Sequence, residues 1–141
     1  MKNKIFIIFL TFFLNPLLHA ENLVIEAKNI SLDKNKETSI FEKEVVVKTD
    51  DNKIIKSDYA EYIKKNNYLL LKGNVIALDQ KNNRIEAEKA EYDGNLKLFK
   101  TIGITKILTS EGYKIEGENI VANNKERIIN SNRETTITDK D

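Results

Sequence analysis

Residues 85–92 read I-E-A-E-K-A-E-Y, and three other parts of the chain repeat this pattern at one constant interval. The related stretches begin at Ile25, Ile55 and Ile115, each with a small residue two positions later and an apolar residue five positions later. Self-similarity at a fixed spacing is typical of repeat architectures, in which each unit buries its apolar face against its neighbours. The sequence therefore predicts four stacked units that start near residues 25, 55, 85 and 115.

The same spacing holds in a second block, which reads K-E-V-V-V at 43–47, G-N-V-I-A at 73–77, G-I-T-K-I at 103–107 and R-E-T-T-I at 133–137. β-Branched residues of this kind favour strands. No segment shows a sustained helical period, and clusters of Asp, Asn, Gly and Ser separate the apolar stretches as turns do. The fold class is therefore predicted to be all-β, with many short antiparallel strands.

The parity of the apolar positions changes inside each unit. Ile85 and Ala87 share one face of a strand, whereas Ala90 and Tyr92 have the opposite parity. A β-bulge or a sharp corner between the two pairs would bring both onto one inner surface. We therefore expect bent strands with an apolar inner face and an outer face of Lys, Glu, Asp and Asn. The outermost strands, near residues 23–30 and 135–138, would leave backbone groups unpaired and suited to strand addition.

Residues 1–20 differ from the rest of the chain. Lys2 and Lys4 precede an apolar run, residues 5–14, and the small residue Ala20 closes the segment. This arrangement predicts a secretory signal peptide over residues 1–20, followed by one domain over residues 21–141. The run is shorter than the roughly 20 residues that a membrane-spanning helix needs. An uncleaved N-terminal anchor is the alternative.

The composition of residues 21–141 excludes several kinds of chemistry. The single His, Pro and Met all lie within residues 1–20, and the chain has no Cys or Trp. Thiol nucleophiles, histidine bases and zinc sites with Cys or His ligands are therefore excluded. Without Lys2 and Lys4, the 23 basic residues become 21 against 22 acidic ones, which gives no general affinity for nucleic acid. We expect no enzyme, no catalytic residue, no metal and no cofactor.

Carboxylates are the remaining candidates for catalysis. Glu86, Glu88 and Glu91 are expected on the outer face, where they would be solvated, whereas a carbohydrate-processing enzyme needs an acid–base pair in a cleft. The cluster at residues 50–52, D-D-N, lacks the regular ligand spacing of a calcium loop. Both alternatives are therefore the weaker interpretation of these residues.

The chain resembles a known family, the OstA-like, LptA-type domains of lipopolysaccharide transport. The resemblance rests on the pattern I-x-A-[DE]-x-A-x-Y at 85–92, more loosely at 55–62, and on K-G-N-V at 72–75, behind an export signal. It extends over residues 23–138. The same domain forms the N-terminal periplasmic part of the LptD translocon, and the inner-membrane-anchored LptC is a more distant member.

The resemblance implies an open, twisted β-jellyroll with an apolar groove for the acyl chains of lipopolysaccharide. It also implies location in the periplasm or at the outer membrane. Edge strands would join it to other OstA-like domains, of the LptC, LptA and LptD types. Units one and four lack the G-N-V stretch, and unit four ends at Asp141, short of a full repeat. Two interpretations stay open: a stand-alone bridge module, or the N-terminal domain of an LptD-type chain. A structural module that assembles through its edges without lipid is a third.

Inner-face residues are predicted to line the groove: Ile25, Ala27, Ile30, Val45, Val47, Ile55, Val75, Ala77, Ile85, Ala87, Ala90, Ile107, Ile115 and Ile120. The small residues among them are explained equally by close sheet packing. The tyrosines are expected at the rims of the sheet, where a ring and a wet hydroxyl both fit, with sugar or base stacking as the alternative: Tyr59, Tyr62, Tyr68, Tyr92 and Tyr113. Turn lysines are expected to be solvated, or to attract lipid phosphates: Lys34, Lys36, Lys64 and Lys65.

Overall fold

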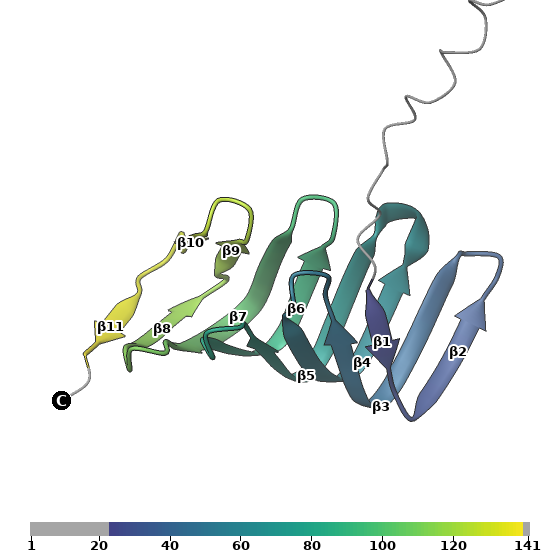
Figure 1. Cartoon of the computed structure of the whole chain (residues 1–141), viewed down its shortest axis with the longest axis horizontal. Helices are drawn as coiled ribbons and strands as arrows, with labels where there is room; N and C mark the ends of the chain where they lie inside the picture. The colour runs from purple at the N-terminus through teal and green to yellow at the C-terminus, as the bar shows by residue number, and fades with distance from the viewer. Residues whose placement is uncertain (1–22, 140–141) are drawn as a thin grey trace, which may run out of the picture.

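Apart from one short turn of 3-10 helix, the regular structure consists of β-strands (Figure 1). The structure, a computed structural model, describes residues 23–139, so the predicted signal peptide lies outside the described residues. The elements are β1 (Val24–Glu26), β2 (Asn29–Asp33), β3 (Thr38–Lys48), β4 (Ile54–Ile63), η1 (Lys64–Asn66), β5 (Tyr68–Leu78), β6 (Arg84–Asp93), β7 (Leu98–Leu108), β8 (Lys114–Glu118), β9 (Val121–Asn123), β10 (Ile128–Asn130) and β11 (Thr136–Thr138).

The eleven strands form a single antiparallel sheet in the order β1-β3-β4-β5-β6-β7-β8-β11. Both β1 and β2 pair with β3, and both β8 and β9 pair with β7, so each of these pairs acts as one long strand that is interrupted in the middle. β10 and β11 then extend the far end by pairing with β9 and β8. Within residues 23–139 the two ends do not pair, and the sheet stays open.

The strands bend near their middles, at interruptions of the pairing register. The interruptions fall between Glu42 and Val45 in β3, Lys56 and Tyr59 in β4, Lys72 and Val75 in β5, and Ala87 and Lys89 in β6. Lys43, Gly73 and Gly103, which occupy equivalent positions of the repeat, each have a left-handed φ, of 64°, 77° and 86°. Left-handed residues break the extended geometry and turn the strand. The corner predicted from the change of parity is therefore confirmed.

Because of the bends, side chains from both halves of each strand face one concave inner surface. In β5, Leu69 and Leu71 precede the corner and Val75 follows it, and all three are at most 1% exposed. They belong to one buried cluster that also contains Val47, Ile55 and Phe99. The all-β, open jellyroll class predicted from the sequence is confirmed, whereas the division into four equal units stays a prediction.

Candidate functional site

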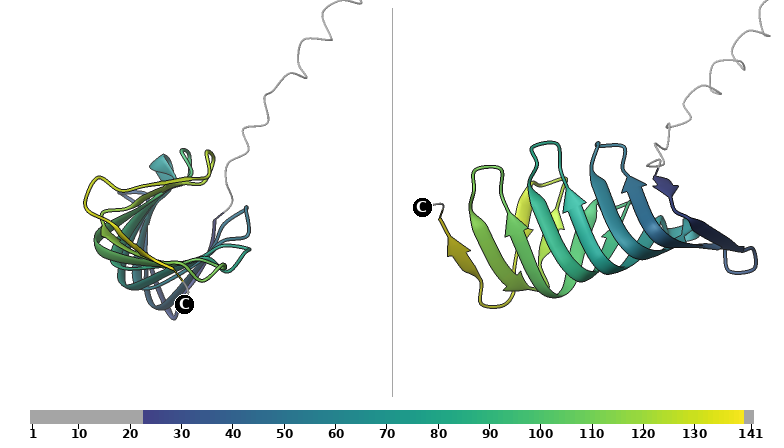
Figure 2. Two further views of the ribbon diagram at one scale, coloured as in Figure 1. Left: turned by 90° about the vertical axis from the view of Figure 1, so that its left-hand side faces the viewer. Right: turned by 90° about the horizontal axis from the view of Figure 1, so that it is seen from below.

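The bent strands form a trough whose mouth lies between two rows of turns, as the view along the long axis shows (Figure 2, left). Rim A consists of the turns at residues 49–53, 79–83 and 109–113. Rim B consists of the turns at residues 34–37, 64–67, 94–97 and 124–127. A left-handed residue closes each turn of rim B: Glu37, Asn67, Lys97 and Arg127. Equivalent turns are therefore stacked along each rim.

Hydrogen bonds tie each turn to the next along its rim. They run from Gln80 Nε2 to the carbonyl oxygen of Asp51 (3.1 Å), from the Ser110 amide to Asn83 Oδ1 (2.8 Å), and from Asn95 Nδ2 to the carbonyl oxygen of Asn66 (2.9 Å). The amide-rich composition of the turns thus has a structural role. It joins neighbouring hairpins beyond the ends of their strands.

A hollow of about 640 Å³ opens in the carboxy-terminal part of the trough. Apolar side chains from both walls form its floor: Ile55, Ala77, Ile85, Tyr92, Phe99, Ile107, Ala122 and Ile129. Polar residues of the two rims surround the mouth: Thr49, Asp51, Lys53, Gln80, Lys81, Asn83, Asn124 and Arg127. An apolar floor with a polar, charged mouth suits a ligand that has both kinds of surface.

The amino-terminal part of the trough is filled by its own side chains. Val45, Val47, Leu69 and Leu71 are at most 1% exposed and belong to one packed cluster with Phe41. Inner-face residues there form a hydrophobic core, and burial of this kind stabilises the sheet by roughly 1.5–3 kcal/mol for each large side chain. The same cluster includes Ile55, Tyr92 and Phe99, which also form part of the floor of the hollow, so the hydrophobic core continues beneath it.

The predicted lining residues fall into overlapping groups, because Ile55 and Ile107 are buried and also line the hollow. Those that line the hollow are Ile55, Ala77, Ile85 and Ile107. Those that are buried are Val45, Val47, Ile55, Val75, Ala90, Ile107 and Ile120. Ile25 on β1, Ala27 between β1 and β2, and Ile115 on β8 are half-buried near the ends of the trough, and Ala87 is half-buried near the corner of β6. Ile30 is 56% exposed, because it lies on β2 and no strand follows at that edge.

Sequence reasoning missed several residues of the hollow, above all Phe99 and Ile129. For Tyr92 the parity of the strand predicted the inner surface and the chemistry of the side chain predicted a rim; Tyr92 is 1% exposed and lines the hollow, as the parity predicted. Its aromatic ring supplies more apolar surface than a rim position would use. Leu69, Phe99 and Ile129 are themselves separated by the repeat interval, so the repeat contained the pattern that could have found them.

An ion pair crosses the mouth from one rim to the other. Lys97 Nζ on rim B lies 3.5 Å from Asp50 Oδ1 on rim A. Beside it, Asp51 accepts hydrogen bonds from Thr49 and Lys53. Partial burial alone would raise the pKa of Asp51, but these hydrogen bonds and the charges of Lys53 and Lys97 outweigh it, so the pKa is lowered. On this part of rim A, Asp50 is therefore paired with Lys97 and Asp51 with Lys53.

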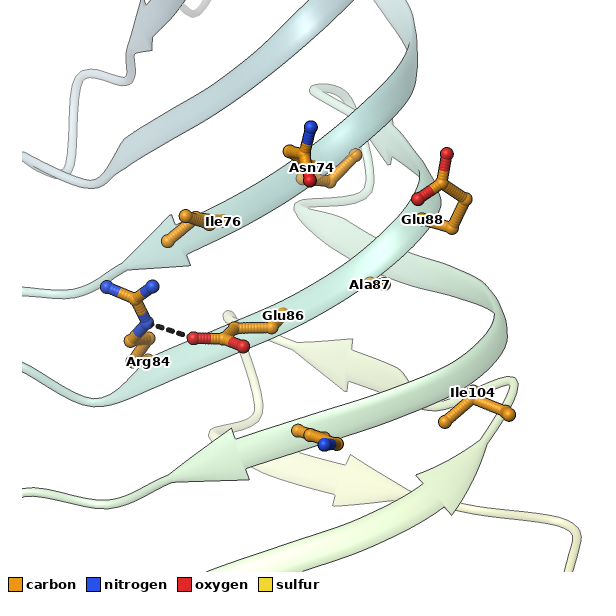
Figure 3. A pocket seen from close by; sticks show the side chains of 9 residues that line it. Asn74, Ile76, Arg84, Glu86, Ala87, Glu88 and Ile104 are labelled. Carbon is orange, nitrogen blue, oxygen red and sulfur yellow. Dashed lines mark hydrogen bonds and ion pairs between the residues drawn. The ribbon is translucent and has the colours of Figure 1, made fainter.

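The outer face has a second hollow, of about 410 Å³, over β5, β6 and β7 (Figure 3). Ile76, Ala87 and Ile104 lie among charged side chains here, and Arg84 pairs with Glu86. The outer face has Lys, Glu and Asn side chains here, as predicted, and in addition Ile104, which is 70% exposed. Strand propensity explains an isoleucine at such a position without burial. The lining of this hollow has two cationic and two anionic side chains, Arg84 and Lys106 with Glu86 and Glu88, so its charges balance.

The groups around the trough suit non-covalent binding. Hydroxyl, amide, ammonium and carboxylate groups surround its apolar floor. Within residues 23–139, no three His, Cys, Asp or Glu residues are grouped to hold a metal ion. In the same part of the chain, no helix has the length and apolar character needed to cross a membrane.

Together these features define the class of the protein as an open β-jellyroll domain with an apolar trough along its inner face. The chain belongs to the LptC-related lipopolysaccharide-assembly family, whose model matches residues 21–138. The resemblance to the OstA-like domains is thereby confirmed.

A solved structure shows the same fold. It is the crystal structure of LptH, the LptA-homologous periplasmic component of the conserved lipopolysaccharide transport device from Pseudomonas aeruginosa. The two superimpose with a TM-score of 0.73 at 16% sequence identity, over 86% of this chain and 96% of that chain. No curated protein sequence matches the chain.

Proposed function

We propose that the protein is a periplasmic module that holds acyl chains of lipopolysaccharide in its trough and passes them toward the outer membrane without a chemical step. The observation that carries this proposal is the apolar hollow between the two rims, whose volume of about 640 Å³ is in the range of ligand pockets. Family membership supports the choice of lipid.

The open mouth favours transfer over permanent binding. Full burial of a methylene group contributes about 0.8 kcal/mol, and a chain in an open hollow gains part of this because one side stays near solvent. Affinity of this kind keeps an acyl chain bound while it leaves the chain free to move to an equivalent surface. The proposed driving force at each step is therefore apolar contact alone.

Transfer requires neighbours, and we propose that OstA-like domains join end to end through the terminal strands. β1 and β2 form one edge of the sheet and β10 and β11 the other. Inner-face residues at both ends are exposed: Ile30 and Leu32 on β2, Ile129 and Ile137 at the far end. Strand addition would cover these side chains and extend the apolar floor into domains of the LptC, LptA or LptD type.

Photo-crosslinking tests the proposal. A photoreactive residue at Ile107 or the half-buried Ile85 is expected to capture lipopolysaccharide, because both line the hollow. Lys106 is the matched control, since it neighbours Ile107 in β7 and is exposed. Capture at Lys106 but at neither Ile107 nor Ile85 would overturn the groove assignment.

The exposed edges also favour a second candidate, a structural module that self-assembles through its edge strands and binds no lipid. Such a module would self-associate with rising concentration whether or not lipid is present. Light scattering with and without lipopolysaccharide separates the two candidates. The hollow itself supports the lipid carrier, because a purely structural module has no use for an open apolar floor.

A further inference from the structure

Successive turns of rim A differ in charge at one equivalent position, where Asp50 is followed by Gln80 and Ser110. Lys97 and Arg127 occupy equivalent positions in successive turns of rim B, and both have a left-handed φ, of 55° and 58°. Lys97 pairs across the mouth with Asp50. The residue equivalent to Asp50 in the next turn of rim A is Gln80, which is uncharged. In the next pair of turns, the cation Arg127 is therefore present on rim B, but rim A has the uncharged Gln80 in place of a carboxylate.

Two cations are available at this step. Lys81 on rim A and Arg127 on rim B both line the mouth of the hollow. Among residues 23–139, neither side chain forms an ion pair or a side-chain hydrogen bond. Lys53, by contrast, is paired with Asp51. Arg127 and Lys81 thus face the mouth from opposite rims with their charges uncompensated.

The remaining acid at the mouth is already engaged. The carboxylate of Asp79 accepts hydrogen bonds from the Lys81 amide (2.8 Å), the Asn83 amide (2.9 Å) and Asn83 Nδ2 (2.6 Å). These bonds hold the carboxylate within its own turn. An external anion therefore has no competitor from this turn for the Lys81 ammonium and the Arg127 guanidinium.

We propose that Arg127, with Lys81, binds a phosphate group of the lipid whose acyl chain occupies the hollow. The inference deepens the proposed function and rests on it. The phosphate takes the place that the Asp50 carboxylate has at the preceding step, and it bridges the two rims. A guanidinium suits this role because its planar donors match the oxygens of a phosphate. The ligand class is therefore a phosphorylated lipid rather than a neutral one.

Equilibrium binding to the full chain tests this, with phosphorylated lipopolysaccharide and the same lipid after removal of its phosphates. Arg127→Gln is expected to weaken binding of the phosphorylated lipid by about tenfold and to leave the dephosphorylated lipid unaffected. Lys125→Gln is the matched control, since Lys125 lies in the same turn but does not line the hollow. It is expected to change neither affinity.

Gln80→Asp supplies a carboxylate at this position and is expected to weaken the phosphorylated lipid in the same way, whereas Gln80→Asn is not. Inorganic phosphate at the same concentration is expected not to displace the lipid; displacement would show a site for free phosphate and overturn the inference. Equal affinity of the unaltered protein for both lipids, or equal effects of Arg127→Gln and Lys125→Gln, would also overturn it. Failure of both lipids to bind would refute the proposed function itself.

Discussion

At the corner of β5, Gly73 combines a left-handed backbone with a close neighbour. A Cβ at Gly73 would lie 2.9 Å from the Cβ of Asp58, whereas a Cβ at Gly103, also left-handed, would meet nothing within 4 Å. Alanine at either position costs about 1–2 kcal/mol for the left-handed conformation. We expect Gly73→Ala to lower the free energy of unfolding by more than Gly103→Ala in urea titrations. Equal losses would show that Asp58 moves aside freely.

The buried hydroxyl of Thr101 joins β7 to the corner that follows β8. It accepts a hydrogen bond from the Ile120 amide (2.9 Å) and another from Thr105 Oγ1 (2.6 Å). Thr101→Val leaves the buried Ile120 amide without this acceptor, which costs about 1–3 kcal/mol. Thr105 Oγ1 donates toward two acceptors, Thr101 Oγ1 and the carbonyl oxygen of Gly103 (3.2 Å), so Thr105→Val leaves no buried donor unpaired and we expect a smaller loss. Urea unfolding of both variants provides the comparison, and a larger loss for Thr105→Val would contradict this account.

The lowered pKa of Asp51 predicts that part of the stability of the folded protein is lost in acid. Its pKa is lowered in the folded protein from the ordinary value of 3.8, so its contribution to stability is present above that value and is lost as the pH falls through the lower folded pKa. We expect Asp51→Asn to be less stable than the unaltered protein at neutral pH and to show a weaker loss below about pH 4. Urea unfolding across this range measures both. Parallel curves for the two proteins would contradict the prediction.

For single residues, the sequence predicted which side chains face inward better than it predicted which of them line the hollow. Periodicity placed Val45 and Ile107 on the inner face, and both are buried. For Tyr92 the strand parity predicted the inner surface, whereas the chemistry of a tyrosine suits both a rim and a core and does not separate the two. The sequence did not single out Arg127, because its proposed role in phosphate binding depends on Gln80. Gln80 belongs to the opposite rim, and the pattern along one strand does not relate the two residues.

At the scale of elements, the terminal strand β2 predicts how domains join. Ile30 and Leu32 are 56% and 67% exposed, so replacing both with lysine is expected to leave the fold intact. We expect the double variant to weaken end-to-end association by about tenfold or more, because joining would bury a charge where an apolar side chain packed. Light scattering over a concentration series measures the effect.

Val24 provides the matched control for that variant. It lies on β1 at the same edge, is 52% exposed, and pairs with the outward-facing Lys48 rather than with an inner residue. Val24→Lys is therefore expected to change association much less. Equal weakening by both variants would show that the edge acts through its charge alone and not through the inner surface.

Strands and corners were largely predictable because both follow from local pattern. The parity change predicted where β6 bends, and the register interruption between Ala87 and Lys89 lies there. The breaks that divide β1 from β2 and β8 from β9 fall in the same part of the repeat, where the parity also changes in the first and fourth units. The corner at Lys43 was harder to predict. Glycine at positions 73 and 103 indicates a left-handed backbone, whereas a lysine does not, although Lys43 has a φ of 64°.

At the scale of the whole molecule, we expect the ion pair between Asp50 and Lys97 to hold the two rims together and so to limit the width of the mouth. Partly exposed pairs contribute about 0–1 kcal/mol, so Lys97→Glu is expected to change the stability little. It places two like charges across the mouth, and we expect the rims to separate. Spin labels at the exposed turn residues Asn52 and Leu96 would report a longer, broader distance distribution.

The reversed pair Asp50→Lys/Lys97→Glu is the control for that experiment. It restores opposite charges and is expected to return the distance distribution toward that of the unaltered protein. High salt is expected to broaden the distribution of the unaltered protein, because ions screen an exposed pair. No change on Lys97→Glu would show that packing below the rims, and not the ion pair, sets the width.

The shape of the molecule was predictable, but the position of the hollow was not. Stacked bent strands follow from the constant spacing of the repeat. Whether the trough is filled depends on which side chains meet across it, for example Leu69 and Val47 in the packed part. That information is three-dimensional, and a pattern read along single strands does not contain it.

The stacked turns of the two rims have a mechanical consequence. Along the trough, many backbone hydrogen bonds join each strand to the next, as between β5 and β6, and the bond from Gln80 to Asp51 joins two turns. Across the mouth, Asp50 and Lys97 supply a weak, partly exposed restraint. We therefore expect the domain to resist extension along the trough more than separation of its rims. On this expectation the mouth would widen while the spacing from one strand to the next, and with it the alignment at both ends, stays fixed.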